Sequence, residues 1–344
     1  MHTEKILMAS LLSAAMLLSA CGGQSAPQSG DPQSGAPQST GSGTTEETAW
    51  VPEGDITIRI HVAAGGSFDT FGRIFAQGIQ KNYGTTVMVT NLTGANGGVA
   101  AADLNSYDPD PCELMGGNIG MFTVTPLFTP DMAMDLEDFE LVGSLVAEEY
   151  ILYAAPGKTG IESWEELVEY AKTNPVLVNS QAAGSTEHAL VTALMGQQGI
   201  EFTSVINDGA AKGLVATVAG DSTVCMGPVS VGRQYIETGE VVPILCFSET
   251  PCTEFEGIEV PTAKSIGSDL VFSTNNFLMA RKGADPEALA QMYDTYVQWQ
   301  ETDEFKELAA NADFVPNNVA GPELEEELLA SAAMFEEIYN TYYK

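Results

Sequence analysis

Two short loops rich in small residues each join a strand-like segment to a helix-like segment, and each has the composition of an anion site. The first lies in "HVAAGGSFDTFGR", residues 61–73, directly after the alternating run "ITIRI". Gly65 and Gly66 lack a Cβ, so the backbone can turn sharply and approach a ligand closely. The following helix start offers unpaired N–H groups and partial positive charge, which suit a carboxylate or phosphate. The alternative is an ordinary turn capped by Ser67. No Gly-Lys-Ser/Thr follows, so the loop does not match a nucleotide P-loop.

The second loop, "SQAAGST" at residues 180–186, has the same arrangement and more hydroxyl groups. It ends the apolar run "VLVN" and precedes a helix that we expect to begin near Glu187. Two such loops, far apart in the chain, suggest two parts of the fold that close around one anion.

The elements that must position these loops alternate along the chain. Alternating apolar residues predict a half-buried strand over 56–62, and Phe71, Phe75 and Ile79 at helical spacing predict a helix over 68–83. Repeated strand–helix alternation predicts an α/β protein with mainly parallel sheets. In such sheets ligands bind at the carboxyl ends of the strands, which is where both loops fall.

Further elements follow from the same patterns. Ser163 and Glu166 form a capping box that starts a helix, and Asp285 before Pro286 starts another. Further strands are predicted over residues 85–92, 112–117, 139–155, 176–179, 222–229 and 241–248.

The N-terminal residues have the composition of a targeting segment and a linker. The run "ILMASLLSAAMLL" is too short to span a bilayer and has the length of a signal-peptide core. It ends in "LSAC" and resembles a bacterial lipoprotein signal peptide over residues 1–20, which implies cleavage before Cys21 and lipidation of its thiol. Ordinary cleavage near Ala20 is the alternative. Residues 21–50, mostly Gly, Ser, Pro, Gln and Thr, predict a disordered tether.

Composition excludes some partners. The 344 residues include 13 Lys and Arg against 47 Asp and Glu, a net charge of −34, so we expect no nucleic-acid partner. Three histidines and the absence of C-x-x-C spacing predict no metal site, and we expect no cofactor. Cys246 and Cys252 are close enough in sequence to pair, and an exported location permits disulfides.

At this point the loops match a known family. The chain resembles the extracytoplasmic solute receptors of tripartite tricarboxylate transporters, the Bug receptors, over about residues 55–340. The first loop is similar to their "PFAAGGxxDxxAR" element, and "NLTGANGGVAAADL" to their "N-x-x-G-A-G-G-x-x-A" stretch. "SWEELVEYAKTNP" and "SQAAGSTEHAL" resemble a family helix and the loop "S-x-G-x-G-S-x-x-H-L". The order and spacing of these motifs carry the resemblance.

The resemblance implies a type II periplasmic-binding fold with two α/β lobes, a ligand cleft and two crossing strands. Lobe 1 would hold residues 51–148 and 268–344, and lobe 2 residues 149–267. The crossings would be strands at 146–155 and 274–283. The ligand-binding positions that the resemblance implies are Ala64, Gly65, Gly66, Ser67, Asp69, Ser180, Gly184 and Ser185. Asp69 has two open roles: it orders its loop or accepts a ligand hydroxyl or amine.

The function implied is solute capture, without catalysis, by a monomer that is lipid-anchored outside the bacterial cell membrane. The protein would deliver a small carboxylate or amino-acid-like solute to integral membrane transporter subunits. His61, Asp208 and Thr223 depart from the family's usual Pro, Lys and Asp, and Asp in place of Lys at position 208 disfavours a highly charged ligand such as citrate.

Two other classes of function stay open. A hydrolase would use Ser185, His188 and Asp69, but Ser185 lacks a G-x-S-x-G elbow. The other class is a surface lipoprotein without a transport role.

Overall fold

The computed structural model describes residues 49–65, 67–180, 184–207, 209–312 and 315–344. The predicted signal peptide, Cys21 and residues 21–48 of the predicted tether lie outside the described residues. The described chain from Thr48 onward forms one compact unit.

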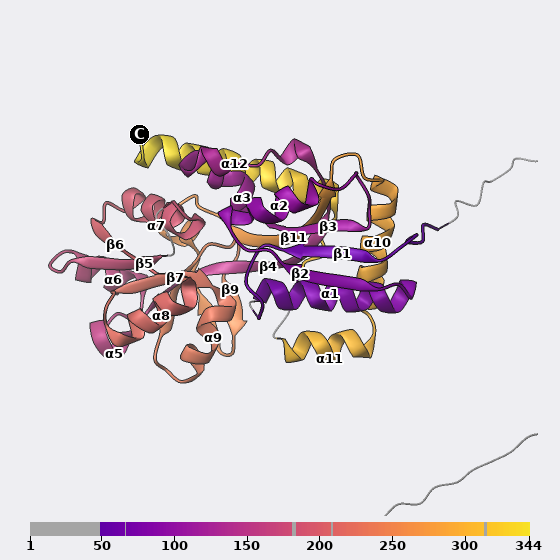
Figure 1. The fold of residues 1–344 in the computed structure, drawn as a ribbon. Helices are drawn as coiled ribbons and strands as arrows, with labels where there is room; N and C mark the ends of the chain where they lie inside the picture. Colours follow the sequence, from indigo (N-terminus) through magenta and orange to yellow (C-terminus); the bar gives the residue numbers. More distant parts are fainter. Residues whose placement is uncertain (1–48, 66, 181–183, 208, 313–314) are drawn as a thin grey trace, which may run out of the picture. The chain divides into compact units, whose positions relative to one another are not determined.

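Strands and helices alternate along this unit (Figure 1). The strands are β1 (Ile56–Ile60), β2 (Val87–Asn91), β3 (Glu113–Asn118), β4 (Phe139–Ala154), β5 (Val176–Ser180), β6 (Phe202–Ile206), β7 (Val224–Pro228), β8 (Val242–Cys246), β9 (Cys252–Phe255), β10 (Ile258–Val260) and β11 (Ser273–Arg281). The α-helices are α1 (Ser67–Tyr83), α2 (Gly98–Leu104), α3 (Ile119–Thr123), α4 (Thr125–Phe128), α5 (Pro156–Thr159), α6 (Trp164–Ala171), α7 (Thr186–Gln197), α8 (Ala210–Ala219), α9 (Val229–Glu237), α10 (Pro286–Trp299), α11 (Asp303–Asn311) and α12 (Gly321–Tyr342). Short 3-10 turns lie at Ala95–Gly97, Pro130–Met132, Leu136–Asp138 and Ala263–Ile266.

Nine of the described strands build one sheet that β4 divides into two halves, and β9 and β10 form a separate two-stranded sheet. Residues 139–149 of β4 pair with β11, and residues 150–154 pair with β7 and β8. We call β2, β1, β3, β11 and the first part of β4 the first half-sheet, and the end of β4 with β7, β8, β5 and β6 the second. Figure 1 shows the first half-sheet on the right and the second on the left. The α/β fold class with two crossing strands is therefore confirmed.

The expectation of mainly parallel sheets is wrong at the centre. Strands β1, β2 and β3 pair in parallel, as do β5, β6 and β7. However, β11 is antiparallel to β3 and β4, and β4 is antiparallel to β7 and β8. The difference arises because β4 and β11 carry the chain between the halves in opposite directions, which local sequence patterns do not reveal.

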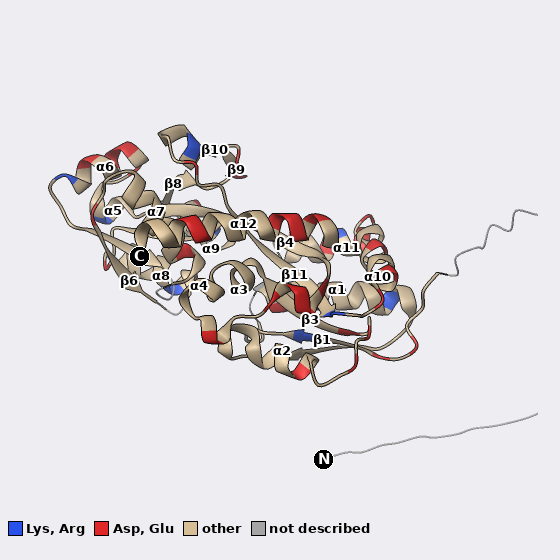
Figure 2. Cartoon of the chain, turned by 90° about the horizontal axis from the view of Figure 1, so that it is seen from above, with Lys and Arg blue, Asp and Glu red and all other residues tan. Residues whose placement is uncertain are grey.

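Apolar faces explain why these segments fold as they do. In α1, Phe71, Phe75 and Ile79 pack with β1 and the aromatic face of α10 in one core cluster. Truncating a fully buried Phe such as Phe75 to Ala would cost about 3–5 kcal/mol of stability. Helix α12 contacts α3 and β4 on one side and α7 on the other, so it packs against both half-sheets. Its outer face, like that of α10, carries acidic side chains (Figure 2).

Predicted helix starts are confirmed. The Ser163 hydroxyl accepts the Glu166 N–H at the start of α6, and the Asp285 carboxylate accepts two N–H groups at the start of α10. Strand β6 and the β9–β10 hairpin were not predicted. Strand β6 has no fully buried residue, and β9 and β10 are strands of only four and three residues, so their sequence patterns are weak.

The structure holds the four described cysteines as buried free thiols, so Cys246 and Cys252 are not paired in it. Burial raises the pKa of Cys225 and of Cys252 to about 12, so both thiols stay protonated. Within the described ranges, no helix has the length and apolar character needed to cross a membrane.

Candidate functional site

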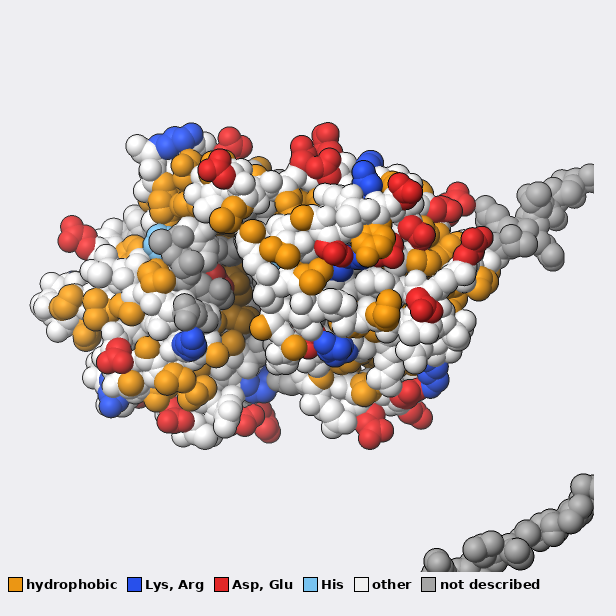
Figure 3. Space-filling model, viewed as in Figure 1, with side chains coloured by type: hydrophobic (Ala, Val, Ile, Leu, Met, Phe, Trp, Pro, Cys, Tyr) orange, Lys and Arg blue, Asp and Glu red, His pale blue; other side chains and the backbone are white. Residues whose placement is uncertain are grey.

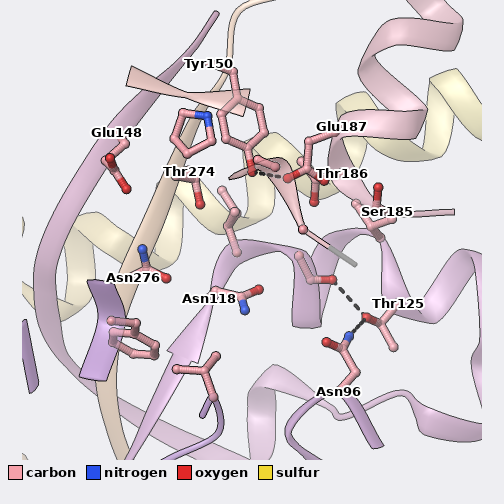
Figure 4. Close-up of a pocket in the computed structure, with 18 of the residues that line it drawn as sticks. Asn96, Asn118, Thr125, Glu148, Tyr150, Ser185, Thr186, Glu187, Thr274 and Asn276 are labelled. Carbon is pink, nitrogen blue, oxygen red and sulfur yellow. Dashed lines mark hydrogen bonds between the residues drawn. The ribbon is translucent and has the colours of Figure 1, made fainter. Parts of the chain in front are cut away.

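A cavity of about 460 Å³ lies between the two half-sheets. Figure 3 shows the molecule hollowed at this place. The polar side chains that line it come from both halves and are labelled in Figure 4. They are Asn96, Asn118, Thr125, Glu148, Tyr150, Ser185, Thr186, Glu187, Thr274 and Asn276. The size suits a small metabolite, and convergent polar groups in one cleft are typical of a ligand site.

The second predicted loop reaches this cavity with consecutive residues. Gly184, Ser185, Thr186 and Glu187 all line it. Gly184 has φ +79°, and a Cβ there would lie 2.8 Å from the Phe128 ring, so the loop needs glycine at this position. The Ser185 hydroxyl accepts the His188 N–H at 3.2 Å and caps α7. The first turn of α7 therefore lies beside the cavity, where the partial positive charge of the helix N terminus would stabilise an anion.

Glu187 is a buried carboxylate in the cavity wall. Its side chain is at the first turn of α7, and the residue is 3% exposed. Burial raises its pKa, and hydrogen bonds from its own N–H, from Tyr150 and from Ser185 act in the opposite direction. The Tyr150 hydroxyl donates to Glu187 Oε1 at 2.9 Å (Figure 4). The helix N terminus also favours a negative charge at this position.

The first predicted loop is organised by its own polar groups. Asp69 is 3% exposed and accepts the Gly65 N–H at 2.9 Å. It also accepts hydrogen bonds from Arg73 Nε at 3.0 Å and Asn91 Nδ2 at 2.8 Å. Burial opposes the charge of Asp69, but these donors lower its pKa. Asp69 therefore orders the loop, which is one of the two roles left open for it.

The other residues of the first loop differ in whether they line the cavity. Ala64 and Gly65 are exposed, and neither belongs to the described cavity wall. Gly66 lies outside the described residues, and Ser67 begins α1. From this region, His61, Val62 and Phe68 line the cavity. A solute contact by Ala64, Gly65, Gly66, Ser67 or Asp69 stays a prediction.

Ser180, from the second loop, ends β5 and is 2% exposed. Its hydroxyl has no hydrogen-bond partner among the described atoms. It does not belong to the described cavity wall, so its predicted contact with a ligand also stays a prediction.

His61 fixes the orientation of a cavity amide. Its Nδ1 lies 3.0 Å from the Gly116 carbonyl and its Nε2 lies 3.0 Å from Asn118 Nδ2. Burial lowers the pKa of His61 to about 4, so the ring is neutral, donates from Nδ1 and accepts at Nε2. Asn118 Oδ1 accepts the Met121 N–H at the start of α3. Asn118 is thereby held with one amide hydrogen left over beside the cavity.

Several cavity residues were not predicted from the sequence. Glu148 and Tyr150 come from β4, and Thr274 and Asn276 come from β11. The signal was present in the two crossing strands, because the polar residues of "EEY" interrupt the buried β4 and those of "STNN" begin the otherwise buried β11. Strands that cross between two halves must run past the cleft, so such interruptions indicate cavity positions.

The residues of the hydrolase alternative are not brought together. Asp69 pairs with Arg73 on α1. His188 Nε2 lies 3.1 Å from the Ser204 hydroxyl, and its Nδ1 lies 2.9 Å from the Tyr343 hydroxyl. The Gly184 N–H also donates toward Nδ1, so that nitrogen is already an acceptor. Within the described ranges, no group of three or more His, Cys, Asp or Glu could hold a metal ion.

Comparison with known families identifies one match over most of the chain. The model of the tripartite tricarboxylate transporter family receptor matches residues 71–329. A curated relative, the "UPF0065 protein in gbd 5'region" of Cupriavidus necator, is 26% identical over 268 residues, covering 77% of this chain and 80% of the relative.

Solved structures share the fold. A TctC solute-binding protein from Polaromonas superposes with a TM-score of 0.72 at 21% identity, covering 84% of this chain and 99% of that one. MatC from Rhodopseudomonas palustris with bound malate gives a TM-score of 0.69 at 20% identity, covering 83% of this chain and 99% of that one.

Proposed function

The chain belongs to the tripartite tricarboxylate transporter receptor family, and we propose that it captures a small carboxylate-bearing metabolite between its two half-sheets for transport. The observation that carries the proposal is the cavity, which both half-sheets line and which the N terminus of α7 borders. MatC, a structural neighbour, holds malate, a dicarboxylate. The protein works outside the cytoplasm and passes its solute to membrane subunits.

Capture involves closure of two lobes. Lobe 1 comprises residues 51–148 and 268–344, and lobe 2 residues 149–267. The change of partners in β4 between Glu149 and Tyr150 supports this division, because the two parts of the strand belong to different halves of the sheet. A bound solute that contacts both lobes stabilises the closed arrangement by its differential affinity for it.

A lipid on Cys21, with residues 21–50 as a tether, keeps this monomer at the membrane surface. Mass spectrometry of the mature protein tests the anchor. We expect a diacylglycerol mass on Cys21 and release of the Cys21→Ser variant into the medium. An unmodified thiol on a protein that still fractionates with membranes would refute it.

A solute screen tests the receptor function. The mature protein is heated with mono-, di- and tricarboxylates and amino acids, and we expect the unfolding temperature to rise with one chemical class, because binding to the native state stabilises it. Calorimetry then gives the affinity. An ester-hydrolysis assay on the same sample addresses the enzyme alternative. Turnover that Ser185→Ala abolishes, without any thermal shift by solutes, would replace the receptor with an enzyme.

A further inference from the structure

The cavity wall carries negative charge without a described Lys or Arg. Its described lining residues include Glu148 and Glu187 and no Lys or Arg, and the ring of the lining residue His61 is neutral. The positions of the chain outside the description between residues 62 and 210 are Gly66, Gln181–Ala183 and Asp208, so the sequence supplies no Lys or Arg there either. The described wall therefore offers no Lys or Arg to offset a second negative charge on a solute.

Two carboxylates line the cavity. Figure 4 shows Glu148 and Glu187 on either side of Tyr150. Glu148 pairs in register with Thr274 across the β4–β11 ladder, so it belongs to the crossing strands. Glu187 belongs to α7. The negative groups therefore face the same space from different elements.

Glu187 is held as a hydrogen-bond acceptor. The donors that the structure shows are the Tyr150 phenol, the Ser185 hydroxyl and its own backbone N–H. Burial raises the pKa of Glu187, and each of these donors acts in the opposite direction because it stabilises the charged carboxylate. These contacts also fix the side chain in place, so a cationic group that enters the cavity meets an oriented acceptor.

The start of α7 also offers groups that can bind the negatively charged part of a solute. Ser185 and Thr186, at the start of α7, border the cavity. They suit a solute carboxylate. An anion site at a helix N terminus beside the buried Glu187 and the partly buried Glu148 matches a ligand that carries both charges.

We propose that the solute captured here carries a protonated amine beside its carboxylate, and that Glu187, together with Glu148, selects for that amine. The inference rests on the proposed receptor function and adds the charge class of its ligand. A di- or tricarboxylate would bring a second negative charge toward these two glutamates, which disfavours it.

Matched solute pairs test the inference. Calorimetry on the mature protein compares aspartate with succinate, glutamate with glutarate, and leucine with 4-methylpentanoate, each pair differing by the amine. We expect the tightest ligand to be an amine-bearing member, with its partner bound about 30-fold more weakly or worse, as for loss of one member of a buried charge pair. A deaminated member that binds as tightly or more tightly overturns the inference and leaves the receptor function standing. No binding by any solute in the screen or in these pairs overturns both.

Glutamine variants of the two glutamates test which residue selects for the solute amine. Glu187→Gln keeps the shape and an acceptor for Tyr150, so we expect about a tenfold or greater loss for the amine-bearing solute and less than about a threefold change for its deaminated partner. Glu148→Gln should also weaken binding of the amine-bearing solute more than binding of its deaminated partner. It replaces Glu187→Gln as the test if that variant fails to fold. The control is Glu165→Gln, an exposed first-turn glutamate of α6, which should leave both affinities unchanged. Equal losses for both solutes in the glutamine variants would contradict the assignment.

Discussion

The two glycine loops have similar sequences but differ in what they do. In the first, the Gly65 N–H is already used by Asp69, and Arg73 and Asn91 complete a small internal network. In the second, Gly184 and the three residues after it face the cavity. A strand–glycine–helix pattern therefore predicts where an anion site can form. The packing of neighbouring side chains determines which loop presents its groups to a ligand.

Alanine at the two glycines should give the largest contrast. Both have positive φ, +86° at Gly65 and +79° at Gly184, so either substitution strains the backbone by about 1–3 kcal/mol. Only at Gly184 does the new Cβ also meet a ring, that of Phe128, which adds about 1–3 kcal/mol. Calorimetry and urea unfolding should show that Gly184→Ala loses about tenfold or more in affinity and Gly65→Ala less than about threefold. Equal losses of affinity would remove the distinction between the loops.

Lowering the pH should destabilise the protein more through protonation of His61, beside the first loop, than through protonation of His188 in α7. The folded-state pKa of His61 is lowered to about 4 by burial, whereas the unfolded chain binds the proton near 6.5. Stability is therefore lost as the pH falls from about 6.5 to about 4, by about 2 kcal/mol at pH 5.

Urea unfolding at pH 7 and pH 5 measures this loss. His61→Asn should lose about 2 kcal/mol less between the two pH values than the wild type does. His188, whose pKa is also lowered by burial but whose ring is only partly buried, should give a smaller difference in His188→Asn. If His61→Asn loses as much stability between pH 7 and pH 5 as the wild type does, the His61 ring is not held neutral in the folded protein.

Asp69→Asn separates an ordering role from a ligand contact. We expect about 1–2 kcal/mol of lost stability, because the Gly65, Arg73 and Asn91 donors lose a charged acceptor. The ion pair itself contributes little of this, since the Arg73 side chain is half exposed, so Arg73→Gln should cost about 0.5 kcal/mol or less. Solute affinity should change by less than about threefold. A loss of affinity without loss of stability would instead make Asp69 a ligand contact.

The smallest effect compares two helix caps. Ser185→Ala and Ser163→Ala each remove a hydroxyl that accepts a first-turn N–H, so each should cost about 1 kcal/mol of stability. Only Ser185 borders the cavity, so only its variant should also weaken solute binding, by about fivefold. Identical affinities in the two variants would indicate that the Ser185 hydroxyl serves only as a cap.

Local sequence patterns predicted the helices and strands but not which strands pair or which residues meet in the cavity. The alternation in β1, the apolar spacing in α1 and the caps at Ser163 and Asp285 depend on neighbours within a few residues, and all were predicted correctly. The antiparallel pairing of β4 with β11 depends on how the chain crosses between the halves. The cavity positions of Tyr150 and Glu187 depend on contacts between residues that are distant in sequence.

The most direct test of the account is a crystal structure of the chain with its solute. The account predicts density between the half-sheets, with the solute carboxylate on Thr186 at the start of α7 and further contacts to Thr274 or Asn276 of β11. A solute in the separate groove between α10 and the start of α12, or one that contacts a single half-sheet, would contradict it.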